Sequence, residues 1–252
     1  MGIVQWAAIC AAAFAAGWVD AIAGGGGLIT VPSLLAIGLP PHLALGTNKG
    51  QSVFGALAAL IRFARAGWID AGRARFFFLA GLLGAWLGST LVLRLHPEVL
   101  KPVILGLLVA AGLFMAIRRP RAGVPAETTV KRADYFRAVA AALAIGTYDG
   151  FFGPGTGTFL IVAFTALMHL PIARASAEAK VVNFASNLAA LGLFAARGVV
   201  VWPIALPMAA CQWLGGTVGA HYAVRRGDTL VRWVVLAVVT ALAAKLAVDL
   251  IR

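Results

Sequence analysis

A short pattern that occurs twice constrains the fold of this sequence most strongly. In each copy an apolar run carries an aspartate near its end, is interrupted by glycines and then resumes as a second apolar run. The aspartates are Asp20 and Asp149, and the interruptions fall at residues 24–27 and 153–157. Because glycine readily adopts the backbone conformations that end a helix, we expect each copy to be a helix that breaks and restarts.

The other apolar runs indicate a membrane protein. Hydrophobic residues make up 62% of the chain and charged residues 12%, about half the charged share of a typical soluble domain. The runs at residues 76–93, 103–117 and 234–250 carry almost no charge. They approach the ~20 residues that a membrane-spanning helix needs. We therefore predict an all-α, polytopic membrane protein.

Five apolar segments are expected in each half of the chain. They cover residues 3–22, 28–38, 42–63, 74–95 and 97–118, and then 134–150, 156–170, 172–196, 202–224 and 229–252. The second segment of each half reaches only ~17–23 Å, which is too short to span comfortably and predicts a half-helix or re-entrant piece. The polar stretch at 119–133 is predicted to be a cytoplasmic linker between two transmembrane repeats, 1–118 and 134–252.

Matching residues indicate that the two halves are repeats. Asp20 and Asp149 are 129 residues apart (149 − 20), and Lys49 and Lys180 are 131 apart (180 − 49). A Trp-Leu-Gly sequence at residues 86–88 also recurs at 213–215. Asp, Lys and Trp are rare in apolar runs, so their recurrence in the same order predicts a duplicated fold.

The net charge of +12 follows the membrane topology. The arginines lie between apolar segments and not on one amphipathic face, so we expect no nucleic-acid partner. Alternation of the segments puts most of them on one side, as the positive-inside rule requires. If each short segment returns the chain to the side it came from, the second repeat is inverted and both termini are periplasmic. Inverted repeats with broken helices build the midplane site of many secondary transporters.

The breaks and two lysines predict an anion site. A glycine break that opens onto a helix leaves backbone N–H groups unpaired at the positive end of the helix dipole. Lys49 and Lys180 lie inside apolar segments, where a charge normally faces a cavity or a partner. The expected substrate-binding residues are Gly24, Gly25, Gly26, Gly27, Thr30, Asn48, Lys49, Gly153, Gly155, Thr156, Gly157, Thr158, Lys180 and Asn183.

Two structural alternatives stay open. The glycines can serve only the close packing of membrane helices. The lysines can be ion-pair partners of Asp20, Asp149 or Glu178 instead of binding substrate. Ion pairing and substrate binding can also coexist in one transport cycle. The two aspartates either cap the broken backbone or take up protons. Glu178 has Thr47 at the matching position of the first repeat, so it is a candidate coupling or structural charge.

Other chemistry is not expected. The four histidines show no metal-ligand spacing, and Cys10 and Cys211 lie in apolar runs, so no metal and no cofactor are predicted. Neither glycine stretch has the lysine and serine or threonine of a P-loop. No catalytic constellation is visible, so we predict that the chain is not an enzyme. The expected partners are a small anionic substrate and the lipid bilayer, with a homo-oligomer possible.

The sequence resembles the sulfite exporter TauE/SafE family, also called the toluene-sulfonate uptake permeases. The resemblance rests on both glycine motifs and on Gly-Thr-Asn-Lys at residues 46–49, and it runs nearly end to end. It implies about eight full spans in two repeats. It also implies a bacterial inner-membrane transporter of sulfite, sulfoacetate or a related sulfonate, with an anion channel of the same architecture as the alternative. Glu178 departs from the small hydroxyl residue expected before the second lysine.

Overall fold

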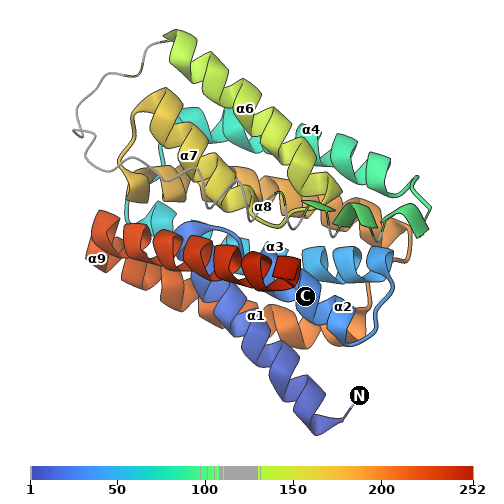
Figure 1. Cartoon of the computed structure of the whole chain (residues 1–252). Helices are drawn as coiled ribbons and strands as arrows, with labels where there is room; N and C mark the ends of the chain where they lie inside the picture. The colour runs from blue at the N-terminus through green and yellow to red at the C-terminus, as the bar shows by residue number, and fades with distance from the viewer. Residues whose placement is uncertain are drawn as a thin grey trace.

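The computed structural model is a bundle of helices (Figure 1). It describes residues 2–96, 98–100, 102–104, 106, 107, 110, 130 and 132–251, and in the last helix it describes side chains only to residue 234, without those of 228 and 232. The helices are α1 (Ile3–Ala23), α2 (Gly27–Ala36), α3 (Pro41–Arg65), α4 (Ala71–Val92), α6 (Arg132–Phe151), α7 (Thr156–Met168), α8 (Ile172–Ala196) and α9 (Trp202–Ile251). No strand occurs within the described ranges.

The fold confirms the prediction of an all-helical membrane protein. Within the part of the chain that the structure describes, α1, α4 and α8 are long and apolar enough to cross a membrane. The two segments predicted to be short are short: α2 has 10 residues and α7 has 13. The fifth predicted segment, residues 97–118, and the linker at 119–133 lie mostly outside the described residues.

A glycine divides the long last helix. Gly227 has φ 58° and ψ −147°, a conformation that no α-helix contains and that glycine adopts without a steric penalty. The break separates residues 202–226 from 228–251. It falls in the gap between the two apolar segments that the sequence predicts there, so α9 is two consecutive helices.

The two halves of the chain are interleaved. The most extensive contacts join α1 to α9, α4 to α6, α3 to α9, and α4 to α8, and each of these pairs takes one helix from each half. Figure 1 shows α4 and α6 side by side along one edge of the bundle. Neither half can therefore form its core without the other.

Glycine contacts in the two halves are reciprocal. A methyl group added at Gly84 of α4 would meet the backbone of α6 at residues 143 and 147, and one added at Gly215 of α9 would meet α1 at residues 14 and 18. Gly88 and Gly219 repeat this relation one turn later. The contact of α4 with α6 is thus repeated by the contact of α9 with α1, with the two halves exchanged. Such an exchange is typical of a two-fold relation, which here supports the duplication. The inverted orientation of the second repeat in the membrane stays a prediction.

These contacts also correct one detail of the repeat. The recurring Trp-Leu-Gly sequence aligns Gly88 with Gly215, 127 residues apart (215 − 88). The structure instead makes Gly84 equivalent to Gly215, and Gly88 equivalent to Gly219, both 131 apart (215 − 84). The difference of four residues is about one helical turn, over which similar apolar faces recur. The alignment of the two Trp-Leu-Gly sequences is therefore out of register by one helical turn.

Candidate functional site

The two broken helices meet. α1 ends at Ala23 and α2 begins at Gly27, while α6 ends at Phe151 and α7 begins at Thr156. Gly24 of the first break lies directly against Gly157, so a methyl group added at either position would overlap the backbone of the other. The two interruptions, 129 residues apart in the chain, form one contiguous site.

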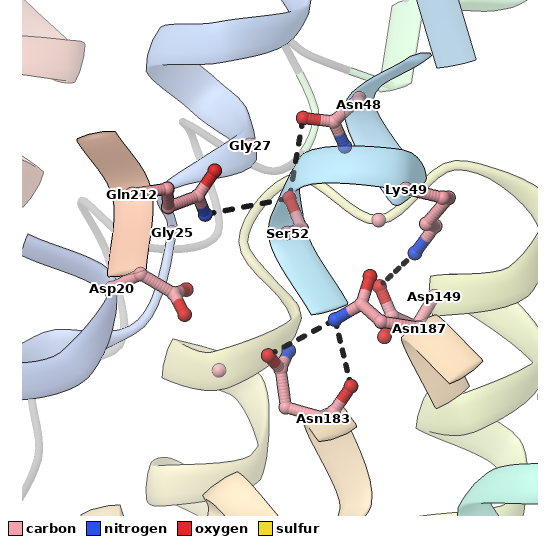
Figure 2. Close-up of a pocket in the computed structure, with 12 residues that line it drawn as sticks. Asp20, Gly25, Gly27, Asn48, Lys49, Ser52, Asp149, Asn183, Asn187 and Gln212 are labelled. Carbon is pink, nitrogen blue, oxygen red and sulfur yellow. Dashed lines mark hydrogen bonds and ion pairs between the residues drawn. The ribbon is translucent and has the colours of Figure 1, made fainter. Parts of the chain in front are cut away.

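A small polar cavity lies between the breaks (Figure 2). The space open to the centres of water-sized molecules is about 20 Å³, so the cavity has room for a water molecule but not for a larger solute. Residues of α1, α3, α6, α8, α9 and both breaks line it: Asp20, Gly25, Gly27, Asn48, Lys49, Ser52, Asp149, Gly153, Gly157, Asn183, Asn187 and Gln212. Charged, amide and hydroxyl groups dominate this lining, which distinguishes the cavity from a helix crossing packed only by small residues.

Two buried ion pairs join the halves across this cavity. Lys49 Nζ lies 2.8 Å from Asp149 Oδ1, and Figure 2 shows the lysine pointing to that carboxylate. Lys180 Nζ lies 2.7 Å from Asp20 Oδ2. Each lysine therefore pairs with the aspartate of the opposite repeat. The ion pairing left open by the sequence is present with both aspartates, and the four charges sum to zero.

The two aspartates differ in their surroundings. Asp149 accepts hydrogen bonds from Lys49 and from the Ser186 hydroxyl, and it shares the Thr156 hydroxyl, at 3.1 Å, with the Gly153 carbonyl at 2.6 Å. Its side chain is 2% exposed. Asp20 accepts one from Lys180 and one from the Gly26 backbone N–H at 3.2 Å, and its side chain is 13% exposed. Asp149 is thus held by more donors than Asp20.

Position 55 accounts for part of this difference. The residue matching Ser186 in the first repeat is Gly55, 131 positions earlier (186 − 55), and it has no hydroxyl to offer Asp20. The space beside Gly55 is filled by the side chain of Gln212 from α9, which also packs against Gly17 of α1. The duplicated site is therefore symmetric in its charges and asymmetric in its hydrogen bonds.

Neutral amides form the rest of the cavity wall. The Asn48 Oδ1 atom accepts a hydrogen bond from the Thr30 hydroxyl, and the Asn187 amide donates to the Asn183 backbone carbonyl at 2.7 Å. Gln212 Nε2 lies 3.5 Å from Ser52 Oγ, while its Oε1 atom is buried without a hydrogen-bond partner in the described structure. An unsatisfied buried amide oxygen costs free energy, which favours a polar guest or water beside it.

Several backbone N–H groups at the breaks are unpaired among the described residues. Of the break residues that line it, Gly25, Gly27, Gly153 and Gly157 donate no backbone hydrogen bond to any residue that the structure describes. The Gly26 N–H, in contrast, is already taken by Asp20. Four of the backbone N–H groups that the sequence predicts as anion donors are therefore unpaired, and the Asp20 carboxylate binds the N–H of Gly26 as an internal anion.

The other predicted residues lie beside the cavity. Thr156 contacts Asp149, and the Thr158 hydroxyl donates to the Ala23 carbonyl at 2.8 Å, which ties α7 to the end of α1. Gly155, with φ 87°, is the residue from which α7 starts. The predicted site residues outside the cavity lining are Gly24, Gly26, Thr30, Gly155, Thr156, Thr158, Lys180 and Glu178. Their roles in binding stay predictions.

Glu178, on α8, does not line this cavity and contacts the start of α4 instead. Its Oε1 atom accepts hydrogen bonds from the Asp70 backbone N–H at 3.2 Å and from Arg73 Nη2 at 3.0 Å. At the matching position of the first repeat, the Thr47 hydroxyl accepts the Val201 N–H at 3.0 Å, just before α9. Both side chains therefore anchor the loop that precedes a helix. Its assignment as a coupling charge stays untested, and the contacts favour the structural role.

Sequence reasoning missed Gln212. It lies in the apolar segment before Val224, where an uncharged polar side chain is the signal to follow, because buried polar groups in membrane helices face partners or cavities. Ser52 and Asn187, which the sequence places on the same helices as the lysines, also line the cavity.

Comparisons with known proteins agree with this architecture. A family profile described as "Sulfite exporter TauE/SafE" matches residues 9–246. A protein called probable membrane transporter protein ORF9, from Sinorhizobium sp, is 37% identical over 94% of this chain and 90% of its own length. A probable membrane transporter protein of Haemophilus influenzae is 37% identical over 99% of this chain and 97% of its own length. The probable membrane transporter protein YfcA of Escherichia coli is 35% identical over 94% and 87%. No solved structure matches the chain.

The apolar helices, the polar site between broken helices and these relatives define a multi-pass membrane transporter. Within that class, the chain belongs to the sulfite exporter TauE/SafE family.

Proposed function

We propose that this protein is a secondary transporter of a small sulfur-containing anion, such as sulfite, sulfoacetate or a related sulfonate. The observation that carries the proposal is the polar cavity between the two broken helices, lined by both glycine breaks and by Lys49. Backbone N–H groups at helix starts and a lysine together provide donors for oxyanion oxygens. The family's description supports sulfite or a related anion as the cargo.

Anion binding has to compete with the internal carboxylates. Because Asp20, Asp149, Lys49 and Lys180 are charge-balanced, an added anion is stabilised only when a lysine exchanges an aspartate for it. Asp20 is the carboxylate that gives way in this proposal, since it has fewer hydrogen-bond donors and greater exposure than Asp149. Release of Lys180 then supplies a cation to the anion, while the Lys49–Asp149 pair holds the halves together.

The positions of Lys180 and Asp20 couple anion binding to a movement between the two halves. Lys180 is on α8 and Asp20 is on α1, so exchange of the carboxylate for a free anion changes the contact between the two halves. A ligand shifts a conformational equilibrium only through a difference in its affinity for the two states. Replacement of an intramolecular salt bridge by a substrate contact is such a difference.

The small volume of the cavity favours a carrier over a channel. A volume of about 20 Å³ for water-sized centres leaves no room for a sulfite ion without rearrangement, as expected of a site that changes shape during transport. Flux measurements in proteoliposomes separate the two functions. Saturable uptake stimulated by substrate on the opposite side is expected of the carrier, and ohmic anion currents would contradict it.

The substrate class is tested by a binding screen on the purified protein. Sulfite, sulfate, thiosulfate, sulfoacetate and acetate are titrated in turn by calorimetry. Saturable binding of at least one sulfur oxyanion, with acetate much weaker, is expected. Equal binding of all five anions, or preference for acetate, would reject the sulfur assignment and leave only an anion site.

We further propose that the protein lies in the bacterial inner membrane with both termini in the periplasm.

A further inference from the structure

A second site lies on the outer surface of the bundle, in a groove between α3 and α9. The groove is lined by Ala58, Ile61, Arg62 and Arg65 of α3 and by Trp213, Thr217, Val218, His221 and Tyr222 of α9. The space open to the centres of water-sized molecules is about 590 Å³, within the range of small-molecule sites. Trp213 and Tyr222 are 37% and 47% exposed, so the groove opens to the surroundings of the bundle.

The groove is graded from apolar to basic along its length. Gly55 packs against Gly216, and Arg62 contacts His221 further along, so α3 and α9 run parallel here. Ala58 and Ile61 on α3 precede the two arginines, and Trp213 and Val218 on α9 precede His221. One end is thus apolar and the other carries the charges. This distribution matches a molecule with an anionic head and an apolar tail.

The positive charge in the groove has no counter-ion among the residues whose side chains the structure describes. Arg62 Nη2 lies 2.7 Å from His221 Nδ1, and because a guanidinium only donates hydrogen bonds, that nitrogen accepts and the imidazole is neutral. The Nε atom of Arg62 is buried without a partner in the described residues. No Asp or Glu lines the groove, and neither Arg62 nor Arg65 enters an ion pair among the residues with described side chains.

The surroundings add to this charge. Arg225 lies one turn beyond His221 on the same helix, and Arg226 follows it. These arginines belong to the loops that the sequence predicts to be cytoplasmic, where the leaflet contains anionic lipids. Tyr222, directly after His221, is an aromatic residue of the kind that contacts headgroups at such a boundary.

We propose that this groove is a binding site for one anionic phospholipid. The phosphate diester accepts hydrogen bonds from Arg62 and Arg65, and an acyl chain lies along Ile61, Val218 and Trp213. The chemistry it recognises is a phosphate with net negative charge, which anionic headgroups and soluble phosphates share and which the choline cation of phosphatidylcholine neutralises. The apolar end of the groove selects the lipid. The site is separate from the cavity between the broken helices and does not depend on what that cavity transports.

Native mass spectrometry of the full chain tests this proposal. The detergent-purified protein is mixed with equal amounts of dioleoyl phosphatidylglycerol and dioleoyl phosphatidylcholine, and the retained lipid is counted. Retention of one phosphatidylglycerol with about tenfold preference is expected from the attraction of each arginine to anionic headgroups. The double variant Arg62→Gln/Arg65→Gln is expected to lose the preference. The control Arg94→Gln/Arg197→Gln removes the same charge from exposed positions outside the groove and is expected to keep it.

Two further arms separate the lipid from other occupants. Thr217→Trp fills the groove without changing its charge and is expected to abolish the retained lipid as well. Glycerol 3-phosphate in excess is expected to leave the lipid in place. Equal retention of both lipids by the unaltered chain, lipid retained in Thr217→Trp, or displacement by glycerol 3-phosphate overturns the proposal. A change from dimer to monomer in the arginine variant would assign the groove to a second copy of the chain instead.

Discussion

The ammonium group of Lys49 lies 2.8 Å from the carboxylate of Asp149, although the two residues are 100 positions apart and belong to different repeats. Lys180 and Asp20 form the same contact in the opposite sense. Crossed pairs of this kind make the two repeats dependent on each other at the point where both helices are broken. They also place two cations beside the cavity in which an anion is proposed to bind.

Removal of Lys49 alone is expected to destabilise the fold, because Asp149 would remain as an uncompensated buried charge. The substitution Lys49→Met should lower stability by about 3–5 kcal/mol. Adding Asp149→Asn to the same chain removes that charge and should restore most of the loss. Thermal unfolding of the detergent-solubilised variants measures both effects. A double variant as unstable as Lys49→Met would show that the lysine stabilises the protein by packing and not by pairing.

The two aspartates are expected to respond differently to the same substitution. Asp20→Asn frees Lys180 from its carboxylate and should tighten sulfite binding by about tenfold, since the anion no longer competes with it. Asp149→Asn, its match in the other repeat, should lower stability more than Asp20→Asn does, because it also leaves the Thr156 and Ser186 hydroxyls without their carboxylate acceptor. Calorimetric titration of Asp20→Asn and thermal unfolding of both variants give the comparison. An unchanged sulfite affinity in Asp20→Asn would contradict the assignment of Asp20 as the exchanging carboxylate.

The contact between the breaks is expected to tolerate no side chain. In Gly157→Ala the new methyl group would overlap Gly24, and relieving that overlap should cost about 1–3 kcal/mol and separate the breaks. Gly192→Ala on α8 is the matched control, because a methyl group there meets no atom within 4 Å. That control should be neutral or slightly stabilising, as in other helix interiors. Folded yield and unfolding temperature distinguish the two. Equal behaviour would mean that the breaks do not touch.

Glu178 is expected to matter for stability more than for binding. Glu178→Gln weakens its interaction with Arg73 and should lower stability by about 1–3 kcal/mol, with anion affinity changed less than about twofold. Thr47→Val removes the equivalent anchor of the first repeat and should act in the same direction. A large change in the pH dependence of uptake in Glu178→Gln, with stability unaltered, would instead favour a coupling role.

The sequence predicted the architecture well because rare residues mark it. Glycines, aspartates and lysines in apolar runs located both breaks, the short helices α2 and α7, and most of the cavity lining. The alignment of α9 with its repeat partner α4 was predicted incorrectly. Its Trp-Leu-Gly sequence matched α4 one turn out of register, because an apolar helix presents nearly the same surface after four residues.

The contacts of each charged residue could not be predicted by matching the two repeats. Glu178 and Thr47 differ chemically but hold equivalent loops, and Gly55 leaves room for Gln212 where the second repeat has Ser186. These relations depend on helices packed across the two halves, which no spacing within one half encodes. The symmetry of the site and the mismatch of Glu178 with Thr47 were therefore predictable, whereas the contacts of the mismatched residues came only from the packed structure.

In the proposed transport cycle, an anion binds between the breaks and takes Lys180 from Asp20. This exchange is tested by a cryo-electron-microscopy map of the protein with saturating sulfoacetate, compared with a map without it. We expect density between residues 24–27 and 153–157, with Lys180 Nζ moved from Asp20 to the sulfonate. An unchanged Lys180–Asp20 contact, with an empty cavity and sulfoacetate bound elsewhere, would contradict it.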